Sequence, residues 1–192
     1  MSERKNDELA RWVEGCKEGS RRAQHKLFKH FYSPMLRLCT RYADSTDEAE
    51  DMLSEGFMKV FSNIGKYETT GSFESWMKRV MVNAALDHRR KYGAKVGFTD
   101  LEEVADSTDI GYDVNSALGR MDASEVMALI RQLPQATRTV FNLFVFDGFS
   151  HAEIAQQLNI SENTSAWHVN AARTRLKNEI YKRNNDKVYD RI

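Results

Sequence analysis

The sequence predicts an all-α protein in which an acidic flexible linker joins two small helical domains, the second containing a helix-turn-helix. The chain has 192 residues with only two prolines and ten glycines, a composition that favours helices. No stretch shows the strict alternation expected of strands. A run of acidic residues without helical periodicity separates two helical segments. We therefore expect domains at 5–95 and 122–183, with the linker at 96–121.

The N-terminal segment, residues 7–43, reads as two helices. Apolar residues recur at helical spacing along it, and Gly19 with Ser20 interrupts the run. Pro34 predicts a kink or a break in the second helix because proline lacks the backbone N–H and clashes with the preceding turn. The aromatic side chains of this stripe are expected to form plain core.

The next helix begins at Ser45, the first residue of a capping-box pattern, and Gly65 is expected to close it. Its inner face is apolar, whereas its outer face is compact and acidic. A charged helical face is commonly only a solvated one, but this surface also suits docking to a basic partner. The outer face comprises Asp47, Glu50, Asp51, Ser54 and Glu55.

Ser72 is expected to cap the next helix, which carries the most basic part of the chain, ending in Arg89, Arg90 and Lys91. The loop before it holds one exposed-looking aromatic residue, Tyr67. Basic groups that neutralise phosphates, next to an aromatic ring that stacks on a base, are typical of single-strand binding. The alternative is a basic last turn that complements the helix dipole.

Residues 150–177 predict a helix-turn-helix. Ser150 and Glu153 form a capping-box pattern, Asn159 suits a left-handed residue that ends the first helix, and Ser161 offers the next N-cap. The second helix places polar residues outward and can enter a major groove. An ordinary helical hairpin is the alternative. Helices before this motif are expected to bury Phe144 and Val145, among others, and the tail after Arg183 is expected to be frayed.

Composition limits the function classes. The formal net charge is zero, so contact with nucleic acid must come from local patches. Cys16 and Cys39 form no CxxC pair and indicate a reducing compartment. No apolar leader or membrane-spanning run is visible, so we expect a cytoplasmic protein. The five histidines show no metal-ligand spacing, and no P-loop or GxSxG is present, so we expect no enzymatic activity, metal or cofactor. His168 is expected at the surface or facing DNA.

Four motifs together carry a resemblance to a known family. AEDMLSEGFMKVF (49–61) and FESWMKRVMVNAALDHRRK (73–91) are similar to the polymerase-binding and promoter-melting helices of bacterial sigma factors. LPQATRTVFNL (133–143) and GFSHAEIAQQLNIS (148–161) are similar to the domain that reads the upstream promoter element. In this order, they make the chain resemble the extracytoplasmic-function group of the sigma-70 class. Unlike typical members, it has serine at position 54 and Gly56 inside the first motif, which predicts a locally weaker helix.

The resemblance implies that the chain binds core RNA polymerase, directs it to specific promoters and helps to melt the DNA. It implies contact with the clamp helices of the largest subunit through Asp47, Glu50, Asp51, Ser54, Glu55 and Phe57. It implies binding of the minus-ten element by Lys66, Tyr67, Trp76, Arg79, Asn83, Asp87, Arg89 and Arg90. It implies reading of the minus-thirty-five element by Ser161, Asn163, Thr164, Ala166, Trp167, Asn170, Arg173, Arg175 and Lys177.

Further partners also follow from the resemblance. The second domain would rest on the flap of the second-largest polymerase subunit, and members of this group are commonly held by an anti-sigma factor. The rival interpretation is a helix-turn-helix regulator that binds duplex DNA alone. That class leaves the Tyr67 loop, the basic helix and the acidic face without a role.

Overall fold

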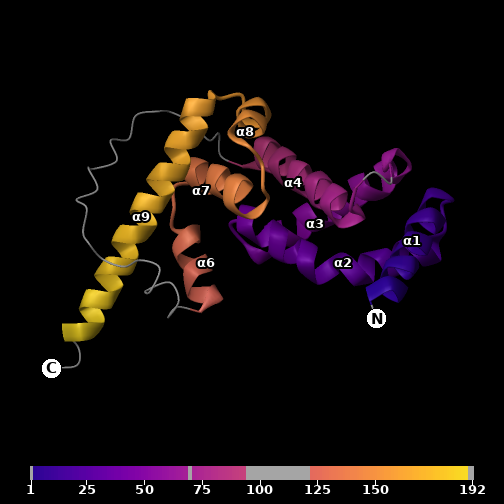
Figure 1. Ribbon diagram of the computed structural model, residues 1–192, viewed down its shortest axis with the longest axis horizontal. Coiled ribbons are helices and arrows are strands. Elements are labelled where there is room, and N and C mark those ends of the chain that lie inside the picture. Colours follow the sequence, from indigo (N-terminus) through magenta and orange to yellow (C-terminus); the bar gives the residue numbers. More distant parts are fainter. Residues whose placement is uncertain (1, 69–70, 94–121, 190–192) are drawn as a thin grey trace. The chain divides into compact units, whose positions relative to one another are not determined.

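Helices account for all the regular secondary structure that the computed structural model describes, which covers residues 2–68, 71–93 and 122–189. No strand occurs in these ranges, so the predicted all-α class is confirmed. The chain divides into two compact units, residues 1–95 and 96–192, whose helices are drawn in Figure 1. The expected linker at 96–121 lies entirely outside the described residues.

The first unit consists of four α-helices and one short 3-10 turn. They are α1 (Ser2–Lys17), α2 (Arg21–Tyr42), α3 (Thr46–Asn63), η1 (Ile64–Lys66) and α4 (Phe73–Tyr92). Helix α2 packs against α1, α3 and α4, and α3 also packs along α4. The core between them is fully buried at Leu27, Met35, Met52, Met77 and Met81. Of the aromatic stripe expected to be core, Phe31 and Tyr42 are buried, and Phe28 and Tyr32 are half-buried.

Two helix starts in this unit follow local signals and one does not. Ser20 and Ser45 cap α2 and α3, accepting hydrogen bonds from the amides of Ala23 (3.4 Å) and Glu48 (3.1 Å). Ser72 precedes α4 but its side chain makes no capping bond. Pro34 does not break α2, which is continuous to Tyr42. Burial of the helix on both sides of the proline outweighs the local cost of the missing N–H.

Gly56 also has a packing role, which the expectation of a locally weaker helix did not include. A Cβ at this position would lie 2.5 Å from the Met81 sulfur, so the glycine lets α3 approach α4 closely. Met81 is fully buried, so its side chain would have to move within the core.

We expect Gly56→Leu to lower the free energy of unfolding by about 2 kcal/mol or more, since overpacking a dense core forces neighbours apart. Urea unfolding followed by circular dichroism measures the effect. Gly65→Leu is the matched control, because a Cβ at Gly65 meets nothing within 4 Å. Equal unfolding midpoints for the two variants would contradict the packing role.

Over residues 122–189, the second unit contains four helical segments with one irregular turn. They are α6 (Ala123–Arg131), α7 (Gln135–Phe141) continued by the π-helical turn η2 (Asn142–Phe146), α8 (His151–Leu158) and α9 (Glu162–Tyr189). Helix α9 packs against α6, α7 and α8. Their shared core includes Ile130, Leu133, Phe141 and Ala172. Helix α9 runs to Tyr189, so the prediction of a frayed tail after Arg183 is wrong.

The π-turn η2 changes which side chains face inward. Its wide turn is closed by the Asp147 amide, which donates to the Asn142 carbonyl over 3.1 Å. The extra residue in the turn rotates the following side chains away from the core. Leu143 is fully buried, whereas Val145 is 46% exposed and Phe144 only half-buried. The expectation that both Phe144 and Val145 face the core is therefore wrong.

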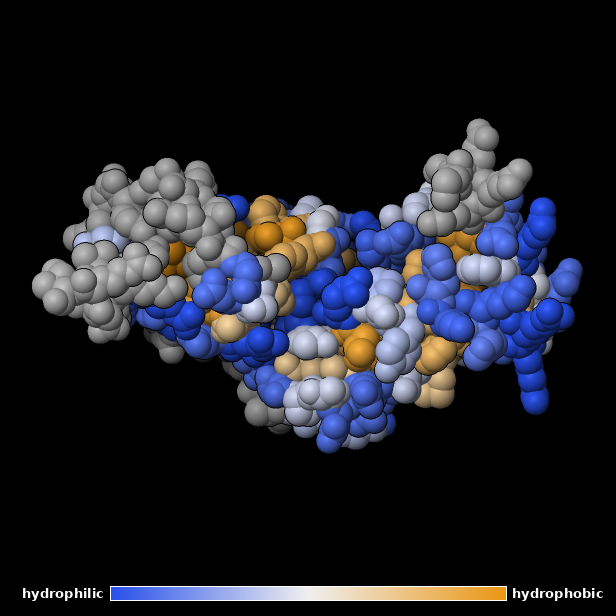
Figure 2. Space-filling model, turned by 90° about the horizontal axis from the view of Figure 1, so that it is seen from below, coloured by the Kyte–Doolittle hydropathy of each residue, from blue (hydrophilic) through white to orange (hydrophobic). Residues whose placement is uncertain are grey.

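The surface is largely hydrophilic on the face that Figure 2 shows, with hydrophobic side chains in small separate patches. None of the helices in the described ranges is long and apolar enough to cross a membrane.

Both cysteines are buried, free thiols in the first unit. Burial raises the pKa of the Cys39 thiol to about 12, outweighing the opposing effect of the Arg41 charge, and burial also raises the pKa of Cys16. Because the thiolate is the reactive form, we expect neither cysteine to react with Ellman's reagent at pH 8 in the native protein. Both should react in guanidinium chloride. Rapid reaction of one thiol without denaturant would contradict this burial.

Candidate functional site

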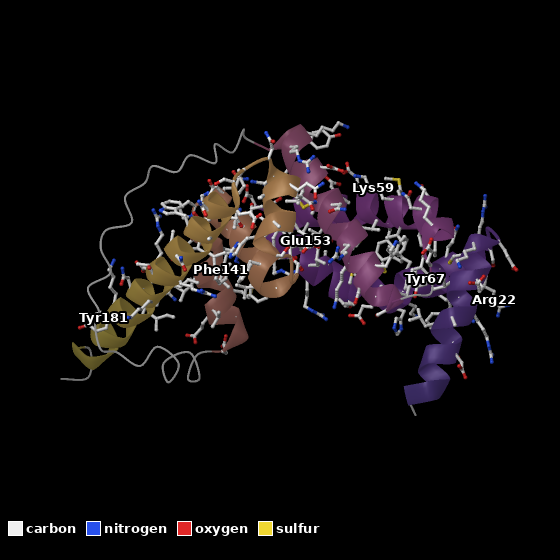
Figure 3. The ribbon with its side chains drawn as sticks, turned by 45° about the horizontal axis from the view of Figure 1, so that its top comes forward. Arg22, Lys59, Tyr67, Phe141, Glu153 and Tyr181 are labelled. Carbon is white, nitrogen blue, oxygen red and sulfur yellow. The ribbon has the colours of Figure 1, made fainter. Side chains whose placement is uncertain are left out.

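Tyr67 lies where η1 meets the start of α4 and is built into an aromatic cluster. Its ring centroid is 5.2 Å from that of Phe73 and 5.6 Å from that of Trp76. Its hydroxyl donates to the Gly71 carbonyl over 2.6 Å. The residue expected to be exposed is thus half-buried, and its ring is held in one orientation. Figure 3 labels its place among η1, α4 and α1.

An open groove of about 350 Å³ runs beside this aromatic cluster. It combines two aromatic rings with cationic side chains, which is the combination that accepts a stacked base and its phosphate. The predicted residues Lys66, Tyr67, Trp76 and Arg79 are brought together here. The full lining is Lys66, Tyr67, Glu68, Gly71, Ser72, Ser75, Trp76 and Arg79.

A lysine from α1, which the sequence did not indicate, also reaches this cluster. Lys17 places its ammonium 5.9 Å from the centroid of the Tyr67 ring, and it pairs with Glu14 over 2.9 Å. A cation over a tyrosine face is attracted by the ring. The contact depends on how α1 packs on η1, and no local pattern in the sequence predicts it.

Three other predicted DNA-binding residues of α4, Asn83, Asp87 and Arg90, are exposed. The Asp87 carboxylate binds the Lys59 ammonium over 2.7 Å and the Arg90 guanidinium over 3.1 Å, so it also orients basic side chains on this surface. Asn83, Arg90 and Arg79 present polar groups to solvent from one helix.

Arg89 does not face solvent, so its expected role as a phosphate contact is wrong. Its Nη1 donates to Asp44 Oδ2 over 2.7 Å and to Glu48 Oε1 over 2.9 Å, and its side chain is only 12% exposed. Burial disfavours the charged guanidinium, but these two hydrogen bonds outweigh it and raise the pKa of Arg89. Arg89 therefore joins the end of α4 to the start of α3.

The acidic face of α3 is exposed as predicted, with Glu55 as the one partial case. Asp47, Glu50, Asp51 and Ser54 are all exposed. Glu55 is half-buried and its Oε2 lies 3.2 Å from Nδ1 of His88, a buried residue of α4.

Phe57 is not part of this surface, and its predicted contact with a partner is wrong. The side chain is 3% exposed, and its ring packs 4.6 Å from that of Phe28. The residue points toward α2 because it occupies the apolar face of α3, so it serves the core.

The helix-turn-helix has the predicted geometry. Ser150 and Glu153 form a complete capping box at α8, with both reciprocal hydrogen bonds present. Asn159 ends the helix in a left-handed conformation at φ 55° and ψ 52°. Gly148 has a φ of +74°, which suits glycine before the Ser150 cap. Helix α8 then packs on α9, so the alternative of a hairpin without this turn geometry is not supported.

Side-chain hydrogen bonds hold the helices of this motif in place. His151 Nδ1 lies 2.9 Å from Ser165 Oγ, and Thr137 Oγ1 lies 3.0 Å from His168 Nδ1. His168 is 3% exposed, so the expectation that it faces the surface or DNA is wrong. Its partner Thr137 in α7 precedes it by 31 residues, so no local sequence pattern predicts this contact.

The predicted recognition residues on α9 differ in their availability. Asn163, Asn170 and Arg173 are exposed. Thr164 is buried and its amide donates to Ser161 Oγ over 2.9 Å, so these two residues form the N-cap, and a base contact by Thr164 is not available. The half-buried members of the predicted set are Ala166, Trp167, Arg175 and Lys177.

Comparison with known proteins agrees with both units. Sigma-70 region 2 matches residues 27–95, and Sigma-70, region 4, matches residues 123–176. The chain belongs to the sigma-70 family. Together the two matches cover more than half of its length, in the order that the motifs predicted.

Curated relatives place this sigma-70 protein in the extracytoplasmic-function (ECF) group. The ECF RNA polymerase sigma-E factor of Haemophilus influenzae is 27% identical over 188 residues, covering 94% of this chain and 98% of that protein. The ECF RNA polymerase sigma factor SigW of Bacillus subtilis is 25% identical over 177 residues, covering 88% and 94%. The chain is thus an RNA polymerase sigma factor, and the stand-alone regulator is not favoured.

A solved structure supports the fold of this sigma factor. The structure of CnrH in complex with the cytosolic domain of CnrY aligns over 89% of this chain and 96% of that chain. Its TM-score is 0.50 at 16% sequence identity.

Proposed function

We propose that this sigma factor docks on the clamp helices of the largest subunit of core RNA polymerase through the exposed acids of α3. In the resulting holoenzyme, the groove at Tyr67 holds an unpaired base of the minus-ten element, and α9 reads the minus-thirty-five element. The chain performs no chemistry of its own and acts in the cytoplasm, where its two free thiols stay reduced.

The groove at Tyr67 is the observation that carries this proposal. A regulator that binds only duplex DNA has no use for paired aromatic rings beside Lys66 and Arg79. Extruding a base costs a few kcal/mol, and stacking on an aromatic ring returns about 1–3 kcal/mol per base. Because the Tyr67 ring is already held by Phe73, Trp76 and the Gly71 carbonyl, little ordering is needed when a base enters.

The phosphates of the same strand would be met by Arg79 and Arg90 on α4, with Asn83 between them on the helix. All three are exposed. The Asp87 carboxylate restrains the Arg90 guanidinium without removing it from solvent. These local cations supply the attraction to DNA that the zero net charge does not give the protein as a whole.

The second unit contributes sequence reading in duplex DNA. Helix α9 presents Asn163, Asn170 and Arg173 outward from a capped helix, as a recognition helix must. We further propose that this unit rests on the flap of the second-largest subunit, and that an anti-sigma factor controls the chain.

The test begins with size-exclusion co-elution of the full chain with core RNA polymerase. Gel shifts of a random promoter-like DNA pool are then measured with each component alone and with both together. We expect stoichiometric co-elution and specific shifts only in the mixture. No association with core, together with tight duplex binding by the chain alone, would overturn the proposal.

Tyr67→Ala then tests the groove on DNA selected from the shifted pool. We expect open-complex formation, read by permanganate reactivity of unpaired thymines, to fall by about tenfold through lost stacking. Tyr67→Phe keeps the ring and should retain most of the activity. Tyr92→Ala is the control, because Tyr92 is 60% exposed and does not line the groove. Full melting by Tyr67→Ala would show that the groove holds no base.

A further inference from the structure

Arg89 connects the helix that carries the DNA-facing cations to the helix that carries the acidic face. Its guanidinium, in the last turn of α4, binds the carboxylates of Asp44 and Glu48 over 2.7 and 2.9 Å. Those partners precede it by 45 and 41 residues. Glu48 also accepts a hydrogen bond from the Asp44 amide over 2.6 Å. The network thus fixes the chain where it enters α3.

This network sorts a dense group of carboxylates into two sets. Asp44, Asp47, Glu48, Glu50 and Asp51 lie within eight residues, and like charges so close repel one another. Arg89 binds the first and third of them: the Glu48 side chain is only 20% exposed, whereas the Asp44 side chain stays 58% exposed. The other three are exposed on the outer side of α3. Arg89 therefore partly neutralises two of the five carboxylates, and the other three form the outer acidic face.

We infer that Arg89 is a positioning residue for polymerase docking: by holding Asp44 and Glu48, it fixes the first turn of α3 and sets the arrangement of Asp47, Glu50 and Asp51 that core RNA polymerase binds. The inference rests on the proposed function, since it concerns the same acidic face. It assigns Arg89 to the polymerase side of the protein, although the residue lies in the DNA-facing helix.

The neighbouring Arg90 is exposed, as expected of an arginine of α4 that contacts DNA. Its side chain is 60% exposed and pairs with the exposed Asp87 carboxylate, whereas the Arg89 side chain is 12% exposed and engaged by two carboxylates. A guanidinium in such a network cannot leave for a phosphate without breaking its hydrogen bonds to two carboxylates. Adjacent residues of one helix thus serve different partners.

The experiment compares Arg89→Met with Arg90→Met in the full chain, at a temperature where circular dichroism shows both to be folded. We expect Arg89→Met to weaken core polymerase binding by about tenfold, in line with loss of charge-assisted hydrogen bonds. Hydrogen exchange should accelerate in peptides covering 44–51. When core polymerase is saturating, the affinity of the Arg89→Met protein for promoter DNA should be unchanged. Arg90→Met should show the reverse pattern.

A reciprocal exchange separates positioning from a general loss of stability. Arg89→Glu combined with Glu48→Arg rebuilds the ion pair in the opposite sense and should restore most of the core affinity that Arg89→Glu alone removes. Arg89→Gln, which keeps N–H donors without the charge, is the milder variant if Arg89→Met does not fold.

Three results would contradict either this inference or the proposed function. Unchanged core affinity in a folded Arg89→Met or Arg89→Gln protein overturns the inference. Reduced promoter affinity at saturating core, with normal core binding, also overturns it and returns Arg89 to the DNA. Failure of the wild-type chain to bind core polymerase instead defeats the proposed function itself.

Discussion

Reversing two charges on the outer face of α3 will weaken core polymerase binding by about 100-fold or more. In the double variant Glu50→Lys with Asp51→Lys, two exposed carboxylates become cations that repel a basic partner. Close charge pairs across interfaces have coupling energies of about 1.5–7 kcal/mol, and about 2.7 kcal/mol corresponds to 100-fold. Fluorescence anisotropy of the labelled chain, titrated with core polymerase, measures the loss.

The fold should survive this change because neither side chain belongs to the core. The matched control is Glu8→Lys with Glu18→Lys, which makes the same change in net charge at two exposed residues of the N-terminal segment. We expect the control to keep core affinity within about twofold, as for exposed charges remote from an interface. The α3 variant should also lose the salt dependence of association. Equal affinities for the two double variants would exclude the acidic face from docking.

Replacing Asn170 on the recognition helix will cost the holoenzyme about 1–3 kcal/mol in promoter affinity, which is the discrimination given by one good amide–base contact. Asn170 is exposed on α9, and its removal leaves no cavity. Asn170→Ala should therefore lose about five- to 150-fold on the cognate upstream element. Its core affinity should not change. Binding competitions against upstream elements mutated base by base measure the effect.

The pattern of losses identifies the kind of contact. If Asn170 reads a base, Asn170→Ala relaxes the preference at one position only. Arg173→Gln, also at an exposed position of α9, should weaken all sequences about equally and reduce the salt dependence. Trp167→Ala is a poorer probe, because the Trp167 ring packs 4.9 Å from the buried His168. An Asn170→Ala protein with unaltered sequence preference would place recognition elsewhere.

Most of the fold could be predicted because its signals are local. The capping boxes at Asp122 and Ser150 are each complete within four residues, and the left-handed Asn159 ends α8 where expected. Helix periodicity also placed the exposed acids of α3 and the exposed polar residues of α9. Periodicity failed at η2, where a π-turn shifted the register and exposed Val145.

The candidate site was only partly predictable, because a residue type does not reveal whether its polar group is already used inside the protein. The sequence placed Tyr67, Trp76 and Arg79 in one site, and the structure unites them in one groove. It also offered Phe57, Arg89 and Thr164, which are engaged within the protein. Lys17 was missed because it reaches the Tyr67 ring from a separate helix.

By itself, the sequence determined the helical class, the helix-turn-helix, the sigma-70 family and the acidic face, since each follows from neighbouring residues or from motif order. Tertiary structure alone decided which charges and aromatics remain for partners. Arg89 finds its carboxylates more than 40 residues away, and Gly56 is needed only because Met81 lies against it. These contacts exist only once α3 and α4 pack together, because burial and pairing depend on distances between helices that no local pattern contains.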